Sequence, residues 1–474
     1  MRHSLPAWGI DDARAGLMAM DLCTAAGLER GDVVAFVGAG GKTGAMFRAA
    51  KELVSQGYRV ITTTTTMIWQ PSAAQSRVVI VEPQEDRLLA NTRRELSYGA
   101  HVTVAASPAK GGKLRGIQSS TVGRLSEMAD IVLVEADGAR GLSLKAPAPH
   151  EPVIPPSTTV VMPVVAVDAV GEGLTEGIAH RPERVAAVTG LSVGETITAE
   201  IVGRLLASTK GGLKAIPNHA RVVCLVNKID AEADLAAGRE IARSCLNTSR
   251  VDSVLLAAVA DDPPVRERWQ RVSAVVLAAG ESRRFGSTKQ LLSLGDETLL
   301  GHVLKRVCAS WASEVLVVLG HAAQRIGSAL EDSSGGTAHR WRTVLAEGWA
   351  GGQSVSVKEG LAAVSSRSQA VIFVLGDQPD ITGGLVNELL VRYAQTGAPI
   401  VAVEHGDQLL PPVLFDRSTF DELRCLSGDA GGREVVRRHI EEVERVVLPE
   451  ACPFRDIDTP EDYSTLKAEG WRAS

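Results

Sequence analysis

The chain has 474 residues, of which 45% are hydrophobic and 22% are charged, and its formal net charge is −6. At roughly 100–200 residues per domain, this length predicts two or three domains, each large enough to bury a core. No Lys/Arg block occurs and aromatic residues make up only 4%, which argues against a nucleic-acid-binding surface.

The six cysteines are single and scattered, without a C-x-x-C pair or a Cys/His cluster of zinc spacing. This pattern indicates a reduced compartment and ordinary core thiols. The N-terminal segment 1–16 lacks the apolar run of a signal peptide, and no run approaches the ~18–20 apolar residues of a membrane span. We therefore expect a cytoplasmic protein with no nucleic-acid and no membrane partner.

Short apolar runs alternate with amphipathic stretches along the whole chain. This alternation predicts an α/β fold with parallel sheets covered by helices on both faces. The strands expected in the first half are Val33–Val37, Arg59–Thr65, Val78–Val81, Ile131–Glu135, Val160–Val167, Arg221–Asn227 and Val254–Val259. Those expected in the second half are Ala274–Ala279, Val315–Gly320, Thr343–Ala346, Val371–Asp377, Pro399–Val403 and Val446–Leu448.

One segment, Asp261–Arg271, carries two prolines and many charges between two apolar strands. Such a composition favours a linker. We therefore expect two Rossmann-like, three-layer α/β/α domains, at residues 1–265 and 272–474.

A glycine-rich stretch follows the first predicted strand. It contains Gly38, Gly40 and Gly41 and leads into Lys42 and Thr43. The stretch approximates a P-loop, although the first glycine of that motif would stand at Phe36. Backbone N–H groups at a helix start favour phosphate, so Lys42 would reach the β/γ-phosphates and Thr43 would ligate Mg²⁺. The alternative is a plain strand-to-helix turn.

Two further motifs of this half support nucleotide binding. Glu135 and Asp137 stand at the end of an apolar strand, where a Walker-B carboxylate would lie. Asn227, Lys228 and Asp230 follow another strand and resemble the N-K-x-D motif that reads guanine in GTPases. Taken singly, these motifs could be strand-end caps and a turn. Together and in this order they predict that residues 1–265 bind GTP or ATP.

The second half opens with its own glycine-containing loop after a buried strand. The residues at the loop start are Leu277, Ala278, Ala279 and Gly280. Small side chains let the backbone approach a ligand, and successive N–H groups can hold phosphate oxygens. Arg283 and Lys289 add positive charge that would neutralise a triphosphate. The alternative is a tight turn with solvated basic residues.

Acidic residues follow two later segments of this half. Asp377 ends an apolar strand, where a carboxylate could bind a Mg²⁺ that bridges triphosphate oxygens, or could cap a turn before Pro379. Asp456 and Asp458 share one face if their stretch is extended, so one of them could be a second metal ligand. Asp458 or Thr459 could instead cap the helix that follows.

These motifs together resemble those of the MobA-like nucleotidyltransferases, and most closely the molybdenum cofactor cytidylyltransferase group. The resemblance covers about Ser273 to Lys467. It rests on LAAGESRRFGSTK, GDQP, DIDTPED, and segments similar to the family's W-x-x-G-x-S-x-S (Glu347–Ser356) and S-G-D-x-G-x-R (Ser427–Arg433).

The resemblance implies a nucleotide-diphospho-sugar transferase-like fold and a Mg²⁺-dependent attack of an acceptor phosphate on CTP, with loss of pyrophosphate. Gly280 and its neighbours would hold the nucleotide, Arg283 and Lys289 would stabilise phosphate charge, and Asp377 would bind the metal. From its position in the chain, we take Asp458 as the second metal ligand. In the family L-A-A-G goes with CTP and L-A-G-G with GTP, so Ala279 indicates cytidine.

Two departures concern the acceptor, which the resemblance gives as the molybdopterin cofactor. The chain reads LPPVLF at Leu410–Phe415 where the family commonly has G-x-P-V-L-F, and Ala346 replaces an asparagine. A sugar phosphate or another phosphorylated acceptor therefore stays open. So does a non-catalytic factor that delivers cofactor to an enzyme.

The first half, about Gly31 to Val259, resembles the YqeC-like proteins, accessory factors for selenium-dependent molybdenum hydroxylases. The matching stretches are VGAGGKT, TTTTTM, GKL at 112–114, VEADGARGLSLKAPAPHEPVIP and HRPE at 180–183. The resemblance implies a molybdenum hydroxylase apoprotein as a partner. Lys145, His150 and Glu151 form a polar group within this match, and the sequence assigns it no role.

Overall fold

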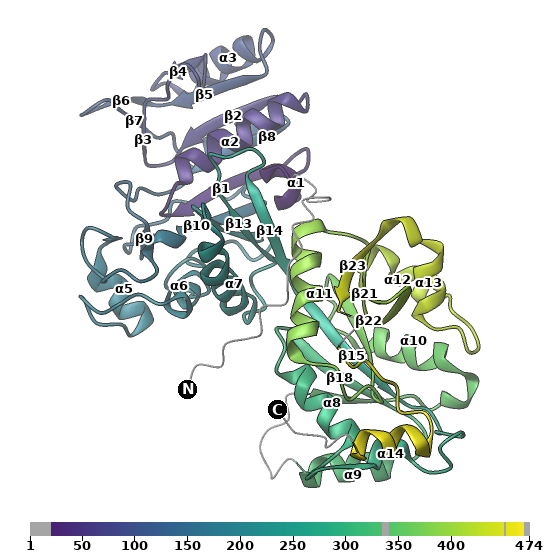
Figure 1. Ribbon diagram of the computed structural model, residues 1–474. Coiled ribbons are helices and arrows are strands. Elements are labelled where there is room, and N and C mark those ends of the chain that lie inside the picture. The colour runs from purple at the N-terminus through teal and green to yellow at the C-terminus, as the bar shows by residue number, and fades with distance from the viewer. Residues whose placement is uncertain (1–19, 334–340, 450–451, 469–474) are drawn as a thin grey trace. The chain divides into compact units, whose positions relative to one another are not determined.

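The computed structural model describes residues 20–333, 341–449 and 452–468. The chain divides into two compact units, and the division falls between Arg271 and Val272. Each unit is an α/β fold built around its own large sheet (Figure 1). No helix in the part of the chain that the structure describes is long and apolar enough to cross a membrane.

The N-terminal unit is built on a nine-stranded sheet with the order β14-β13-β12-β10-β1-β8-β2-β5-β4. Its strands are β1 (Val33–Gly38), β2 (Val60–Thr64), β4 (Val79–Val81), β5 (His101–Ala105), β8 (Ile131–Glu135), β10 (Val160–Ala166), β12 (Arg221–Asn227), β13 (Ser253–Ala257) and β14 (Val265–Gln270). Smaller sheets join β3 (Met67–Trp69), β6 (Ser107–Ala109) and β7 (Lys113–Arg115), and β9 (Leu144–Lys145) with β11 (Ala179–His180). The helices are α1 (Leu22–Ala26), α2 (Lys42–Ser55), α3 (Glu85–Leu96), α4 (Thr121–Ser126), α5 (Pro182–Thr189), α6 (Ala199–Leu206) and α7 (Glu232–Leu246).

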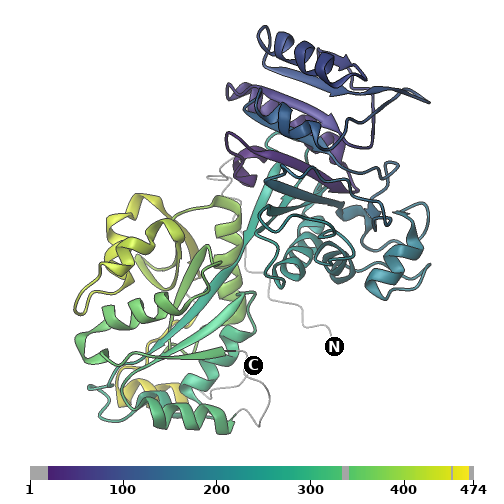
Figure 2. The ribbon, with the colours of Figure 1, turned by 180° about the vertical axis from the view of Figure 1, so that it is seen from behind.

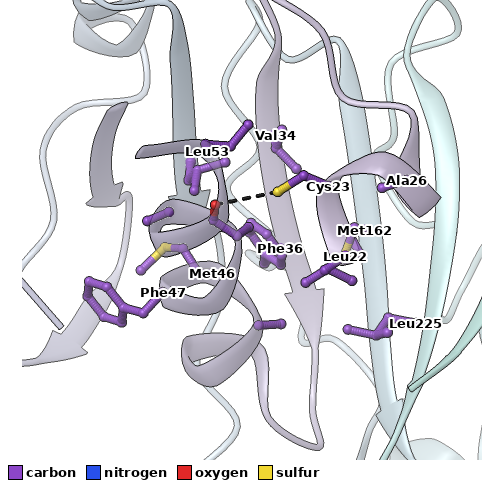
Figure 3. Packing of buried hydrophobic residues seen from close by; sticks show 14 of the residues in the cluster. Leu22, Cys23, Ala26, Val34, Phe36, Met46, Phe47, Leu53, Met162 and Leu225 are labelled. Atoms are coloured by element: carbon purple, nitrogen blue, oxygen red, sulfur yellow. Dashed lines mark hydrogen bonds between the residues drawn. The ribbon is translucent and has the colours of Figure 1, made fainter. Parts of the chain in front are cut away.

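Helices cover both faces of this sheet, as expected for three layers. Val34 and Phe36 of β1 belong to a buried cluster with residues of α1 and α2. Val33 belongs to a separate cluster with residues of α3 and α4. In the first cluster Cys23 donates its thiol to the carbonyl of Ala49 at 3.4 Å (Figure 3). Successive β-strand side chains point to opposite faces, so the apolar runs of the sequence supply both cores.

The segment expected to be a linker is in part a strand. β14 pairs antiparallel with β13 and forms one edge of the sheet, so this sheet is mixed rather than wholly parallel. Val265, Glu267 and Trp269 are buried on one face of β14. Glu267 accepts hydrogen bonds from Arg239 at 2.5 and 3.1 Å and from Trp269 at 2.8 Å. The charges of the segment are therefore partly internal, which its composition does not reveal.

β5 was missing from the predicted strands because His101 and Thr103 interrupt its apolar pattern. Both side chains contact the hydroxyl of Thr62 on β2, at 3.1 Å for His101 and 2.7 Å for Thr103. Cross-strand hydrogen bonds of this kind satisfy polar groups inside a sheet. The polar residues are thus compatible with a buried strand.

The C-terminal unit has a seven-stranded sheet with the order β19-β18-β15-β20-β22-β21-β23 (Figure 2). Its strands are β15 (Val272–Ala278), β18 (Glu314–Leu319), β19 (Trp341–Leu345), β20 (Ala370–Leu375), β21 (Ile400–His405), β22 (Gln408–Asp416) and β23 (Val443–Leu448), with a small β16 (Ser293–Leu294) and β17 (Glu297–Thr298) pair beside them. The helices are α8 (Leu299–Cys308), α9 (Ala323–Ser333), α10 (Gln353–Ala363), α11 (Gly383–Thr396), α12 (Phe420–Arg424), α13 (Gly432–Arg438) and α14 (Pro460–Ala468).

The expectation of a wholly parallel sheet is also wrong for this unit. β22 runs antiparallel to both of its neighbours, β20 and β21. The chain reverses from β21 to β22 through two residues, Gly406 and Asp407, and Gly406 has a φ of 59°. Two-residue hairpin loops require such positive φ values, which glycine adopts without strain. The segment Leu410–Phe415, which departs from the family pattern, lies inside β22.

Candidate functional site

The predicted nucleotide loop of the C-terminal unit begins where β15 ends. β15 and β20 are parallel neighbours with Leu277 opposite Leu375, so both strands end at the same sheet edge. The buried Gln290 donates its amide to the carbonyls of Ala278 at 3.2 Å and Gly280 at 3.0 Å. This amide fixes the start of the loop to its far end. A methyl group placed on Gly280 would meet no atom within 4 Å, so the backbone there faces open space.

A cavity of roughly 470 Å³ lies at this edge. Every residue predicted for the transferase site lines it, namely Leu277, Ala278, Ala279, Gly280, Arg283, Lys289, Asp377 and Asp458. The carboxyl ends of β15 and β20 therefore gather residues that lie up to 181 positions apart, from Leu277 to Asp458. Binding at this edge is typical of open α/β sheets.

The centre of the cavity is an ion cluster. The Lys289 ammonium contacts the carboxylate of Asp377, and it lies 2.9 Å from that of Asp458. Burial alone would lower the pKa of Lys289, but the two carboxylates outweigh it and raise that pKa above its usual range. The second oxygen of Asp377, Oδ1, is buried and has no hydrogen-bond partner in the described part of the chain. The cluster thus offers carboxylate oxygens of the kind that divalent cations bind.

The two acids that the sequence left open have different surroundings in the structure. Asp456 accepts a hydrogen bond from Gln378 at 2.7 Å, and burial raises its pKa. Asp458 lines the cavity and faces Lys289. The helix-cap role falls to Thr459, whose hydroxyl accepts from the N–H of Asp462 at 3.2 Å. The Asp462 carboxylate accepts from the N–H of Thr459 at 2.7 Å, which completes a capping box.

The second predicted cation is at the mouth of the cavity. Arg283 is 82% exposed and pairs with Glu281 at 2.6 Å. Its neighbour Arg284, which the sequence did not single out, lies 3.6 Å from Asp458 and also lines the cavity. Two adjacent arginines were the only sequence signal for this residue. Exposed guanidinium groups remain able to turn toward phosphate oxygens.

A second cavity of roughly 770 Å³ borders the first and shares Leu277, Gln353, Leu375 and Asp429 with it. Two family-like segments meet here. The N–H of Ser354 donates to the carbonyl of Gly428 at 3.1 Å. A methyl group on Gly352 would lie 2.4 Å from the same oxygen, so only glycine fits. The segment that contains Trp349 and the one that contains Asp429 therefore form the boundary between the two cavities.

In the N-terminal unit, the glycine-rich loop joins β1 to α2, and α2 begins at Lys42. The φ angles are 95° at Gly38, 79° at Gly40 and 115° at Gly41. A methyl group would lie 2.2 Å from the backbone of Ala166 if placed on Gly40, and 2.4 Å from an Asn227 amide if placed on Gly41. The loop therefore requires glycine for both conformation and space.

Side chains from the next strand, β8, meet this loop. Thr43 donates its hydroxyl to Glu135 at 2.6 Å, and burial raises the pKa of Glu135. The Lys42 ammonium donates to the carbonyl of Gly38 at 2.6 Å and lies 3.3 Å from Asp137. The two acids thus have different partners: Glu135 pairs with the threonine and Asp137 with the lysine.

The N-K-x-D segment meets the loop through its first residue. The Asn227 amide donates to the carbonyl of Gly40 at 2.8 Å and accepts from the N–H of Val259 at 3.1 Å. Lys228 pairs with Asp168 at 2.5 Å. Asp230 has an exposed side chain just before α7. The structure therefore brings Asn227 to the loop and leaves the carboxylate of Asp230 open to solvent.

The polar group of unassigned role joins the same network. The Lys145 side chain is fully buried, and its ammonium lies 2.8 Å from Asp137 and 3.0 Å from Glu151. Arg181 pairs with Glu151 at 2.7 Å and, against the effect of burial, helps to lower the pKa of that carboxyl to about 2. His150 is exposed. The link between Lys145 and Asp137 could not be predicted, because only the folded chain places them together.

Comparisons with known proteins match each unit separately. Residues 34–183 match the family model described as YqeC protein, and residues 274–443 match that of the MobA-like NTP transferase domain. The uncharacterized protein YqeC of Escherichia coli is 30% identical over 245 residues, which are 51% of this chain and 93% of that protein.

The C-terminal unit has similar proteins of its own. The purine catabolism protein PucB of Bacillus subtilis is 29% identical over 201 residues, 41% of this chain and 94% of that protein. A crystal structure of Rv0371c from Mycobacterium tuberculosis in complex with manganese is 27% identical, covers 42% of this chain and 98% of its own, and has a TM-score of 0.36.

Proposed function

Since the chain belongs to the YqeC family in its N-terminal unit and carries a MobA-like NTP transferase domain in its C-terminal unit, we propose that the C-terminal unit transfers CMP from CTP to the molybdopterin cofactor. The cluster of Lys289, Asp377 and Asp458 beside the LAAG loop carries this proposal. It combines a cation for phosphate and two carboxylates for a metal in a cavity that reaches the backbone of Gly280.

The residues of the cluster fit a divalent metal. Asp377 and Asp458 would hold a Mg²⁺ ion, since Asp377 has a buried carboxylate oxygen without a partner. When bound, Mg²⁺ supplies positive charge to the triphosphate and to the leaving pyrophosphate. In that state Lys289 is released from part of its pairing and can donate to phosphate oxygens, together with Arg283 at the mouth.

The second cavity would bind the acceptor. Its lining includes the half-buried apolar side chains of Leu375, Leu409 and Pro411 and the exposed guanidinium groups of Arg433 and Arg437. A pterin that carries a phosphate needs both an apolar surface for its rings and cations for the phosphate. Because the cavities share a boundary, the acceptor phosphate can approach the α-phosphate of CTP.

In the reaction, an oxygen of the acceptor phosphate forms a bond to the α-phosphorus of CTP. The bond between that phosphorus and the oxygen bridging to the β-phosphate breaks, and pyrophosphate leaves with its electron pair. Catalysis of this kind depends on positioning and on charge stabilisation. Lys289 and Arg283 would supply that charge from this chain.

Incubation of the full chain with CTP, Mg²⁺ and molybdopterin tests the proposal. The expected products are pyrophosphate and a pterin heavier by one cytidylyl group (CMP less one water), read by mass spectrometry. A product formed only with sugar phosphates would move the acceptor to that class. Tight binding of CTP and cofactor without pyrophosphate release would instead support a non-catalytic delivery factor.

We further propose that the N-terminal unit binds a nucleoside triphosphate, with guanine favoured. The observation that supports this is the convergence of Lys42, Thr43, Glu135 and Asn227 on one glycine-rich loop. Calorimetric titration of the full chain with Mg²⁺ and each triphosphate tests it, with Lys42→Ala as the control that removes only the N-terminal contribution. Absence of Lys42-dependent binding at millimolar nucleotide would make this unit a cofactor- or protein-binding module.

A further inference from the structure

A buried carboxylate stands between two lysines beside the N-terminal glycine-rich loop. The side chain of Asp137 is 2% exposed. Its Oδ1 lies 3.3 Å from the Lys42 ammonium, and its Oδ2 lies 2.8 Å from the Lys145 ammonium. Both oxygens also lie 3.1 Å from the N–H of Gly38. Asp137 therefore contacts two groups that a bound phosphate would need, the first N–H of the loop and the Lys42 ammonium.

The partners of Asp137 distinguish it from the neighbouring acid. In phosphate loops the Ser/Thr hydroxyl and a strand-end carboxylate together serve the metal. Here the Thr43 hydroxyl donates to Glu135, so Glu135 lies beside the residue that would ligate the metal. Asp137 lies on the lysine side, where it competes with any anion that approaches Lys42.

Lys145 compensates the charge of Asp137 independently of Lys42. Its ammonium is held by the carbonyl of Gly138 at 2.6 Å and by Glu151 at 3.0 Å, and Arg181 fixes Glu151 at 2.7 Å. When Lys42 turns toward a phosphate, Asp137 therefore keeps a counter-ion. A buried carboxylate without one would be strongly unfavourable and would retain Lys42.

We propose that Asp137 is an internal competitor of the β/γ-phosphates for Lys42, and that Lys145 is the positioning residue that allows the exchange by neutralising Asp137. The inference rests on the proposed triphosphate binding by this unit. It assigns opposite effects to two neighbouring charged residues. Removal of the Asp137 charge should strengthen triphosphate binding, and removal of the Lys145 charge should weaken it.

The test is calorimetric titration of the full chain with Mg²⁺ and a non-hydrolysable GTP analogue. All variants carry Asp377→Ala, so that the C-terminal cavity contributes little to the measured binding. The part of the binding that is lost when Lys42→Ala is added is assigned to the N-terminal unit. Asp137→Asn can still accept from Gly38 and should tighten the Kd by roughly tenfold, the size of one charge-assisted contact. Lys145→Met should loosen it by a similar factor, but it should have little effect in the double variant, which should bind about as tightly as Asp137→Asn because no Asp137 charge remains to be neutralised.

The double variant separates this role from a structural one. If Lys145 only supported the fold, Lys145→Met would loosen the Kd by the same factor with Asp137→Asn as without it. Should Lys145→Met fail to fold, the sign of the Asp137→Asn effect decides, since weaker or unchanged binding in that folded variant would overturn the inference. No Lys42-dependent binding in either the reference chain or Asp137→Asn would overturn the triphosphate proposal itself, and the inference with it.

Discussion

Both units place a loop with a lysine after a parallel strand, and the two loops are built differently. In the N-terminal unit three glycines with positive φ lead directly into α2, and Lys42 is 4% exposed beside Asp137. In the C-terminal unit the loop is longer and open, and Lys289 is 15% exposed beside Asp377. The first loop is thus closely packed around its glycines and a buried ion pair, whereas the second opens onto a cavity.

This difference shows what each site can do. Under the proposed functions, N–H dipoles at the helix start would hold the phosphates of one nucleotide in the N-terminal unit. In the C-terminal cavity, the cations and a metal held by the two carboxylates would stabilise charge as it develops on pyrophosphate. Four substitutions test this comparison, and they are given below from the largest expected effect to the smallest.

Asp377→Ala should have the largest effect. Loss of the proposed metal carboxylate should lower the rate of CMP transfer by at least about a hundredfold, since a bound metal contributes several kcal/mol to the transition state. Pyrophosphate release measures it, and thermal melting shows that the variant is folded. Asp296→Ala, at an exposed acid of the same unit, is the matched control. A folded Asp377→Ala enzyme with near-normal turnover would show that another group holds the metal.

Lys42→Ala tests the N-terminal site. The variant should bind nucleoside triphosphate roughly tenfold more weakly or worse, because a charge-assisted contact to the β/γ-phosphates is lost. Calorimetry in the presence of saturating CTP measures the remaining GTP binding. Lys51→Ala, at an exposed lysine of the same helix, should leave the Kd unchanged. Equal Kd values for both variants would contradict phosphate binding by this loop.

Asp230→Ala tests base recognition in the N-terminal unit. An exposed carboxylate can accept two hydrogen bonds from guanine, so its removal should reduce the preference for GTP over ATP by about tenfold. Competition titrations with the two nucleotides measure the ratio. Glu232→Ala, at an exposed acid two residues further, should keep the wild-type ratio. A preference that survives Asp230→Ala would mean that the base is read elsewhere.

Ala279→Gly should have the smallest effect. Ala279 lines the cavity, and it is 3% exposed with its side chain packed toward Gly320, so removal of its methyl group would loosen this wall of the cavity and admit a purine more easily. We expect the ratio of kcat/KM for CTP over GTP to fall by about three- to tenfold, the range for one methyl group in a binding pocket. Ala274→Gly, which removes a buried methyl group of the same strand away from the cavity, is the control and should leave the ratio unchanged. A wild-type enzyme that prefers GTP would refute the assignment of CTP as the substrate.

The sequence by itself determined the elements on which both sites rest. Apolar β-branched runs fixed β1, β8, β15 and β20, because a strand buried on both faces requires them. Small residues after a strand, followed by cations, predicted phosphate binding at both loops, since few residue types allow a backbone to approach a ligand. These inferences depend on neighbours in the chain, which the sequence displays directly.

Only the tertiary structure decided contacts between residues far apart. β22 runs antiparallel, and β14 is a strand rather than a linker, because their partners lie in the rest of the sheet. The pairing of Asp458 with Lys289, and of Lys145 with Asp137, follows from strand order rather than from spacing. A carboxylate in a sequence has no fixed partner, and its role is set by the charge and burial that the folded chain places around it.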